Sequence, residues 1–172
     1  VTVVLHRVFH MSDYGGTNEI IHRLEDKGPI RVIAAPLIFI STAITHLFGG
    51  SAGREGAAIQ LGGTIAYALS NILRLKKKEC TVFIMSGMSA VFAGLFGTPL
   101  TAAFFVLEFK LAANVVSLAI LPCFISAVIA GKVSSLMGVA EETFHLSNIT
   151  SFTFHSVAKI IVLSIGLSVL GK

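Results

Sequence analysis

Apolar residues dominate five long stretches of the chain, and short polar or glycine-rich segments separate them. The stretches are Val32–Gly50, Gly56–Leu73, Cys80–Leu107, Leu111–Gly131 and Val157–Leu170. A helix that crosses a bilayer needs about 20 predominantly apolar residues. The first, second and fourth stretches have about that length, so each is predicted to form one transmembrane helix. The opening residues Val1–Phe9 are also helix-like.

The third stretch, Cys80–Leu107, is too long for one straight helix. Its 28 residues would extend about 42 Å at the helical rise, whereas the hydrocarbon core is about 30 Å thick. It contains Gly97-Thr98-Pro99, where the proline removes a backbone donor and restricts the residue before it. We therefore predict two helices, Thr81–Phe96 and Pro99–Glu108, of which the second is too short to cross alone. Broken backbone at membrane depth is stable only when it is buried in protein or lines a wet cavity.

Composition restricts the class of protein further. Only 13% of the 172 residues are charged, 54% are hydrophobic, and the mean hydropathy is +0.85. A soluble domain, with about 25% charged residues, covers more of its surface with polar groups, and a disordered chain has low hydrophobicity and high charge. The expected fold class is therefore all-α: a polytopic membrane protein with broken and re-entrant helices.

Basic residues lie in short tracts between the apolar stretches. The net charge is +4 and the pI is near 9.3, but this placement is typical of membrane topology rather than of a nucleic-acid-binding face. The loop Arg74–Lys78 and the basic residues Arg23, Lys27 and Arg31 are predicted to face the cytoplasm, and Glu141–His155 the outer side. The lipid bilayer is an expected partner, and nucleic acid is not.

The segment with the most chemistry is Gly49-Gly50-Ser51-Ala52-Gly53-Arg54-Glu55-Gly56. Its glycines let backbone N–H groups approach a ligand closely. The helix that begins at about Gly56 presents unpaired N–H groups and the positive end of its dipole. Together these features predict an anion-binding site, which is partly buried if the flanking helices lie at membrane depth.

Glu55 places a carboxylate where such a site would hold an external anion. The carboxylate would block the site when ionised and leave it when protonated, so anion passage would depend on protons or on pH. The alternative is that Arg54 and Glu55 only form capping contacts at a helix interface.

Two further breaks are candidates for the same site. The loop Tyr14-Gly15-Gly16-Thr17-Asn18 precedes a short amphipathic segment, Glu19–Leu24, and is either a second anion loop or an ordinary interfacial turn. The break Ala93–Pro99 is expected to aim the short helix Pro99–Leu107 at the same centre. Small residues before this break suit close helix packing.

Other chemistry is not indicated. The six histidines form no metal-binding pattern, and no phosphate loop, dinucleotide fingerprint or nucleophile elbow occurs. Neither a metal, a cofactor nor an enzymatic activity is therefore expected. His46 lies one turn before the glycine-rich segment and is either a pH-sensing residue or a packed interfacial one. Cys80 and Cys123 are expected to be packing residues rather than a disulfide pair.

Gly53-Arg54-Glu55-Gly56, followed by Gln60, resembles the signature of the CLC family of chloride channels and proton-coupled anion antiporters. Gly87–Glu108, with its Phe-Gly-Thr-Pro-Leu core, is similar to the next conserved block of that family. The resemblance implies that Glu55 is the external gate of an anion pore. It also implies a homodimer with one pore per subunit, each subunit built from two inverted halves, of which this chain matches the first.

Two departures from the family pattern refine the expectation. The first anion loop of the family reads Gly-Ser-Gly-Ile-Pro, and its serine coordinates chloride, whereas Tyr14–Asn18 has no serine at the matching place. This loop, together with His46–Ala52, is similar to the bacterial branch that exports fluoride. Phe109 stands where chloride antiporters carry an internal proton glutamate, which the fluoride branch need not use.

The resulting hypothesis is a pore for chloride or fluoride, gated by Glu55, in a bacterial plasma membrane, with proton counter-transport left open. The expected anion-binding residues are Gly15, Gly16, Thr17, Asn18, Gly53, Arg54, Glu55 and Gly56. The alternative is a non-transporting membrane scaffold or a degenerate half-protein. Because the chain begins at Val1 and stops at Lys172 beside an apolar stretch, residues 1–172 are expected to be a partial transmembrane anion-transport domain without the second inverted half.

Overall fold

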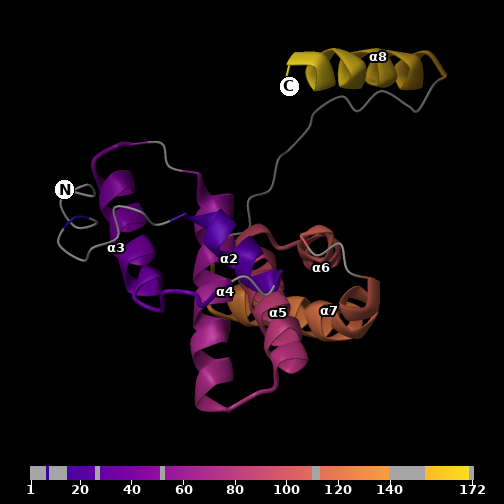
Figure 1. Cartoon of the computed structure of the whole chain (residues 1–172). Coiled ribbons are helices and arrows are strands. Elements are labelled where there is room, and N and C mark those ends of the chain that lie inside the picture. Colours follow the sequence, from indigo (N-terminus) through magenta and orange to yellow (C-terminus); the bar gives the residue numbers. More distant parts are fainter. Residues whose placement is uncertain are drawn as a thin grey trace. The chain divides into compact units, whose positions relative to one another are not determined.

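The structure is a computed structural model that describes residues 7, 15–25, 28–50, 53–109, 113–139 and 154–170. Within these residues the chain forms seven helices and no strand (Figure 1), which confirms the all-α expectation. The helices are α2 (Thr17–Leu24), α3 (Ala34–Leu47), α4 (Arg54–Ile72), α5 (Lys77–Phe96), α6 (Pro99–Glu108), α7 (Ala113–Leu136) and α8 (Phe154–Leu170). The expected opening helix Val1–Phe9 lies outside the described residues, apart from Arg7. Residues Val1–Glu142 form one compact unit, and Thr143–Lys172 a second that contains α8.

The predicted break in the third apolar stretch is confirmed. Helix α5 ends at Phe96 because Gly97 adopts a left-handed conformation (φ 66°), and its N–H donates to the Ala93 carbonyl oxygen at 2.8 Å. Pro99 opens α6, where its missing N–H costs no helical hydrogen bond. The start of α5 lies four residues before the predicted Thr81. The Glu79 carboxylate accepts a hydrogen bond from the Lys76 backbone N–H at 2.9 Å and so caps an earlier helix start.

Helix α5 is the centre of the first unit and packs against α4, α6 and α7. Its contact with α4 is close because Gly62 and Gly87 face each other across it. A methyl group on Gly87 would lie 2.7 Å from the Gly62 carbonyl oxygen and 2.5 Å from the Ala66 Cβ. Glycine at these positions therefore sets the distance between the two helices.

Three serine hydroxyls connect α5 with α7, each donating to a backbone carbonyl oxygen of the facing helix. Such bonds satisfy the hydroxyl inside an apolar contact and contribute about 0.6 kcal/mol each in membrane proteins. The pairs are Ser126 to Ser86 (2.9 Å), Ser89 to Cys123 (3.1 Å) and Ser134 to Gly94 (2.8 Å). Both Cys80 and Cys123 are buried free thiols, as expected of packing residues.

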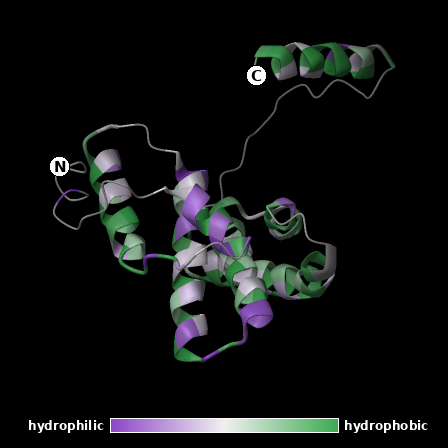
Figure 2. Ribbon diagram, viewed as in Figure 1, coloured by the Kyte–Doolittle hydropathy of each residue, from purple (hydrophilic) through white to green (hydrophobic). Residues whose placement is uncertain are grey.

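Hydrophobic residues predominate along α6, α7 and α8, and hydrophilic residues lie mainly in α2 and near the ends of α4 and α5 (Figure 2). Within the described residues, α5 and the segment Val115–Leu136 of α7 are long and apolar enough to cross a membrane. The prediction of one full crossing over Val32–Gly50 is wrong in length. Helix α3 has 14 residues, about 21 Å, because a turn at Val32–Ile33 precedes it and Gly49 (φ 74°) follows its end.

Candidate functional site

The first part of the candidate site is the start of α4. Gly53 is extended (φ −61°, ψ 125°) and Arg54 is the first helical residue, so Glu55 lies in the first turn. The N–H groups of this turn have no helical partner, and the positive end of the dipole lies here. A methyl group on Gly53 would lie 3.5 Å from Glu55 Oε2, which shows that the carboxylate turns back over the helix start. Arg54 and Glu55 are both exposed.

The second part is the start of α2. Gly16 has φ 60° and ψ −132°, a conformation that favours glycine, and it turns the chain directly into Thr17, the first helical residue. The Asn18 N–H donates to the Gly15 carbonyl oxygen, and the Glu19 N–H to that of Gly16, both at 3.1 Å. These bonds close a tight turn at the helix start, with Gly15 and Asn18 exposed.

The two helix starts meet. The Gln60 side-chain amide of α4 donates to Thr17 Oγ1 at 3.0 Å, across 43 residues of sequence. Two glycines flank this bond: a methyl group on Gly56 would lie 3.6 Å from Thr17 Oγ1, and one on Gly16 would lie 3.6 Å from Gln60 Nε2. The structure therefore brings Gly16, Thr17 and Gly56 together. The other expected residues lie at the same two helix starts, on their exposed side.

Other contacts hold α2 in this position. Ile20 and Leu24 are fully buried, and the Glu19 carboxylate accepts a hydrogen bond from the Arg31 N–H at 3.1 Å. Arg23, which was predicted only to face the cytoplasm, places its Cζ 5.4 Å from the Tyr67 ring centroid. These contacts fix the direction of α2 and hence the place of its N-terminus.

Gln60 was not among the expected site residues, although it belongs to the motif that carries the family resemblance. The spacing contains a signal for it. Residues four apart share one face of a helix, so Gln60 follows Gly56 on the side that faces α2. Its partner on α2 could not be found from spacing, because the contact is between distant segments.

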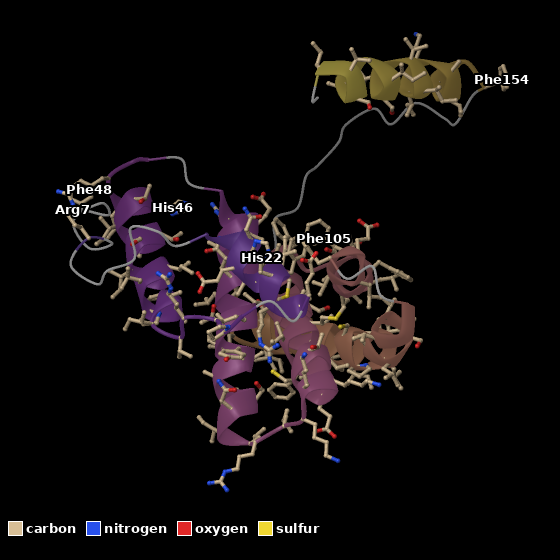
Figure 3. The ribbon with its side chains drawn as sticks, viewed as in Figure 1. Arg7, His22, His46, Phe48, Phe105 and Phe154 are labelled. Atoms are coloured by element: carbon tan, nitrogen blue, oxygen red, sulfur yellow. The ribbon has the colours of Figure 1, made fainter. Side chains whose placement is uncertain are left out.

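The structure does not bring the short helix after the Ala93–Pro99 break into contact with the junction of α2 and α4. Helix α6 packs against α5 and α7, and in the described part of the chain it contacts neither α2 nor α4. Its buried face places it there: Ala102 and Val106 are fully buried, and the Phe105 ring (Figure 3) lies 4.9 Å from that of Phe92. The Phe109 ring, at the position where the resemblance led us to look for a proton glutamate, contacts the Phe105 ring edge to face, with 5.3 Å between the ring centroids.

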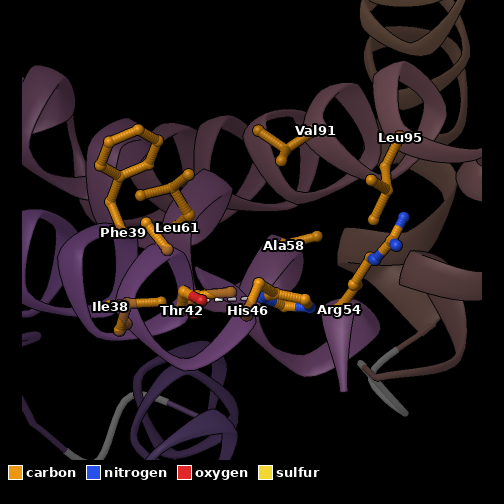
Figure 4. A pocket seen from close by; sticks show the side chains of 11 residues that line it. Ile38, Phe39, Thr42, His46, Arg54, Ala58, Leu61, Val91 and Leu95 are labelled. Atoms are coloured by element: carbon orange, nitrogen blue, oxygen red, sulfur yellow. Dashed lines mark hydrogen bonds between the residues drawn. The ribbon is translucent and has the colours of Figure 1, made fainter. Parts of the chain in front are cut away.

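A cavity of about 500 Å³ lies between α3, α4 and α5 (Figure 4). It is lined by mostly apolar side chains, namely Ile38, Phe39, Thr42, Ala43, His46, Arg54, Ala57, Ala58, Leu61, Val91 and Leu95. Such a lining disfavours a bare anion, which needs hydrogen-bond donors when it leaves water. His46 Nδ1 donates to the Thr42 carbonyl oxygen at 2.7 Å, near the exposed end of α3 (Figure 3).

Among the residues that the structure describes, no group of three His, Cys, Asp or Glu side chains could hold a metal ion. The features that remain are helix starts, glycines, a hydroxyl and a carboxylate. Together with the packed helices α2–α7, they define the class of protein. It is an all-helical membrane protein whose broken segments bring helix N-termini together.

Comparison with known proteins identifies the family. The family model described as "Voltage gated chloride channel" matches residues 1–172, and the chain belongs to this family, the CLC family. The "Chloride/fluoride channel protein" of Pseudomonas syringae pv. tomato is 35% identical over 159 residues, which are 91% of this chain and 35% of that protein. The crystal structure of a CLC-type fluoride/proton antiporter matches with a TM-score of 0.85 and 34% identity, over 99% of this chain and 43% of that one. The chain therefore spans less than half the length of either protein.

Proposed function

We propose that the protein to which this chain belongs transports a small halide anion, chloride or fluoride, across the membrane through a pore that Glu55 gates. The observation that carries the proposal is the junction of the α2 and α4 starts. Gln60 joins Thr17 there at 3.0 Å, and the Glu55 carboxylate turns back over the first turn of α4. Membership of the CLC family supports the same conclusion.

The junction suits a halide that must bind and leave again. Each helix start carries the equivalent of about half a positive charge, spread over N–H groups that point at the ligand. Two such starts attract an anion without a buried lysine or arginine, whose full charge would hold the anion too tightly for passage. The expected ligands are Gly15–Asn18 from α2 and Gly53–Gly56 from α4.

Glu55 acts in this proposal as a tethered competitor of the anion. When ionised, its carboxylate occupies the positive end of α4, where a negative charge gains about 0.3–1 kcal/mol. When protonated, it loses that stabilisation and leaves the place to the halide. Proton binding and anion passage are thereby linked at one side chain, which supports proton counter-transport.

Fluoride is the version we propose first, with chloride as the alternative. The loop before Thr17 lacks the serine with which the family coordinates chloride, and the similar solved structure is described as a fluoride/proton antiporter. Phe109 contacts the Phe105 ring and offers no carboxylate, so in this version the proton binds at Glu55 without a glutamate at position 109. From the family resemblance we further propose a homodimer in a bacterial plasma membrane.

The test uses the full-length protein in liposomes loaded with fluoride or with chloride. Ion-selective electrodes follow anion release while a pH electrode follows proton movement, and protein-free liposomes give the leak rate. We expect fluoride to leave faster than chloride, with protons moving in the opposite direction. Release of both anions at the leak rate would refute the proposed transport, and equal rates without proton movement would refute the antiporter version.

A further inference from the structure

Gln60 is a long polar side chain that joins α4 to the start of α2. Its amide N–H donates to Thr17 Oγ1 at 3.0 Å, and the two residues are 43 positions apart. Gly16 and Gly56 lie on either side of this bond, each with its missing methyl group 3.6 Å from one of the bonded atoms. The bond therefore joins the start of α2 to the first two turns of α4.

The direction of this hydrogen bond decides what the Thr17 hydroxyl can do. A hydroxyl has one hydrogen to donate and two lone pairs to accept. Gln60 occupies a lone pair of Thr17 Oγ1, so the Thr17 hydrogen is left to donate elsewhere. Inside a helix it would donate to a carbonyl three or four residues back. Thr17 is the first residue of α2 and follows the non-helical cap Gly16, so α2 itself offers no such carbonyl.

We propose that Gln60 is a positioning residue, which orients the Thr17 hydroxyl so that its hydrogen donates to the anion between the α2 and α4 starts. This inference rests on the proposed transport function. The Thr17 O–H adds one directional donor to the diffuse attraction of the helix starts. Because fluoride accepts a stronger hydrogen bond than chloride, the donor favours fluoride.

The structure also allows a plainer role, in which Gln60 only ties α4 to α2. The two roles differ in how Gln60 and Thr17 depend on each other. If Gln60 acts through the Thr17 hydroxyl, removing the amide has no further effect once the hydroxyl is gone. If Gln60 only holds the helices, its loss lowers the unfolding temperature and leaves the apparent affinity unchanged.

The experiment is a double-mutant cycle in the full-length protein, measured by electrode in liposomes. The variants are Gln60→Met, which keeps the length of the side chain, Thr17→Val, and the double variant, with Thr17→Ser as the variant that keeps the hydroxyl. Asn71→Leu, at an exposed position near the other end of the same helix, is the matched control. Each variant is assayed for the apparent KM for fluoride and for chloride and for its unfolding temperature in detergent.

We expect Gln60→Met to raise the KM for fluoride about 10-fold and the KM for chloride less. In the Thr17→Val background it should raise neither further, and in the Thr17→Ser background it should act as in the wild type. Asn71→Leu should change nothing. A fluoride KM unchanged by Gln60→Met, or KM increases that multiply in the double variant, would overturn the positioning role while the wild type still transports. A wild-type protein that moves no anion would instead refute the proposed function on which this role rests.

Discussion

Gly87 offers the sharpest test of the contact between α4 and α5. In Gly87→Ala the new methyl group would lie 2.7 Å from the Gly62 carbonyl oxygen and 2.5 Å from the Ala66 Cβ. Carbon atoms in contact lie about 3.5–4.0 Å apart, so the methyl group is about 1 Å too close to Ala66. One neighbour is a backbone oxygen and the other a Cβ atom, so neither can move away by a change of side-chain rotamer. The helices must separate instead.

The cost of that separation follows from two opposing contributions. Overpacking of a tight contact costs about 1–3 kcal/mol. Alanine is a better helix former than glycine by about 1 kcal/mol, which offsets part of the loss. Gly94→Ala on the same helix isolates the second contribution, because its methyl group would meet its nearest neighbours, in α7, at an ordinary 3.9 Å.

The assay is thermal unfolding of the purified full-length protein in detergent. Gly87→Ala should unfold at a lower temperature than Gly94→Ala, with a difference in stability of about 1–3 kcal/mol between the two variants. Adding Ala66→Gly to Gly87→Ala should restore part of the loss, since it removes one of the two clashes. Equal unfolding temperatures for Gly87→Ala and Gly94→Ala would refute the close approach of the helices.

Three further predictions concern the gate, the helix break and the serine contacts. Glu55→Gln imitates the protonated carboxylate, so it should abolish proton coupling and change anion flux in liposomes; an unchanged proton-to-anion ratio would remove Glu55 from the gate. Gly97→Ala forces a side chain into a left-handed conformation (φ 66°) and should cost about 1–2 kcal/mol in thermal unfolding, whereas no loss would contradict the backbone geometry of the break. Ser134→Ala removes the 2.8 Å hydrogen bond to the Gly94 carbonyl oxygen and should cost about 0.6 kcal/mol; a cost equal to that of Ser135→Ala, at an exposed position, would show that the bond does not stabilise the contact.

The break between α5 and α6 was predicted from the sequence because local chemistry decides it. Pro99 cannot continue a helix that comes from its N-terminal side, and Gly97 accepts the left-handed turn that ends α5. A membrane protein was also predicted from the sequence, because composition and long apolar stretches can be read without knowing which segments contact one another. The membership of the CLC family followed from Gly53–Gly56 and its neighbours, and the family match confirms it.

The sequence did not predict correctly where α6 packs or how long α3 is. Helix α6 was predicted correctly as a short helix, but its place against α5 and α7 depends on which side chains its buried face meets. The apolar stretch Val32–Gly50 was predicted to be one crossing, and the turns at its two ends shortened it to α3. Hydropathy does not distinguish an apolar residue in a helix from one in a turn beside it.

The sequence by itself determined that these segments are helical and where the third apolar stretch breaks, because backbone restrictions at glycine and proline and the solvent preference of each side chain act within a few residues. Only the tertiary structure decided that the start of α2 lies against the start of α4 and that Gln60 bonds to Thr17. That contact depends on the burial of Ile20 and Leu24 and on the glycines that let α4 approach α5. Such packing is a property of several distant segments at once, so no local pattern specifies it.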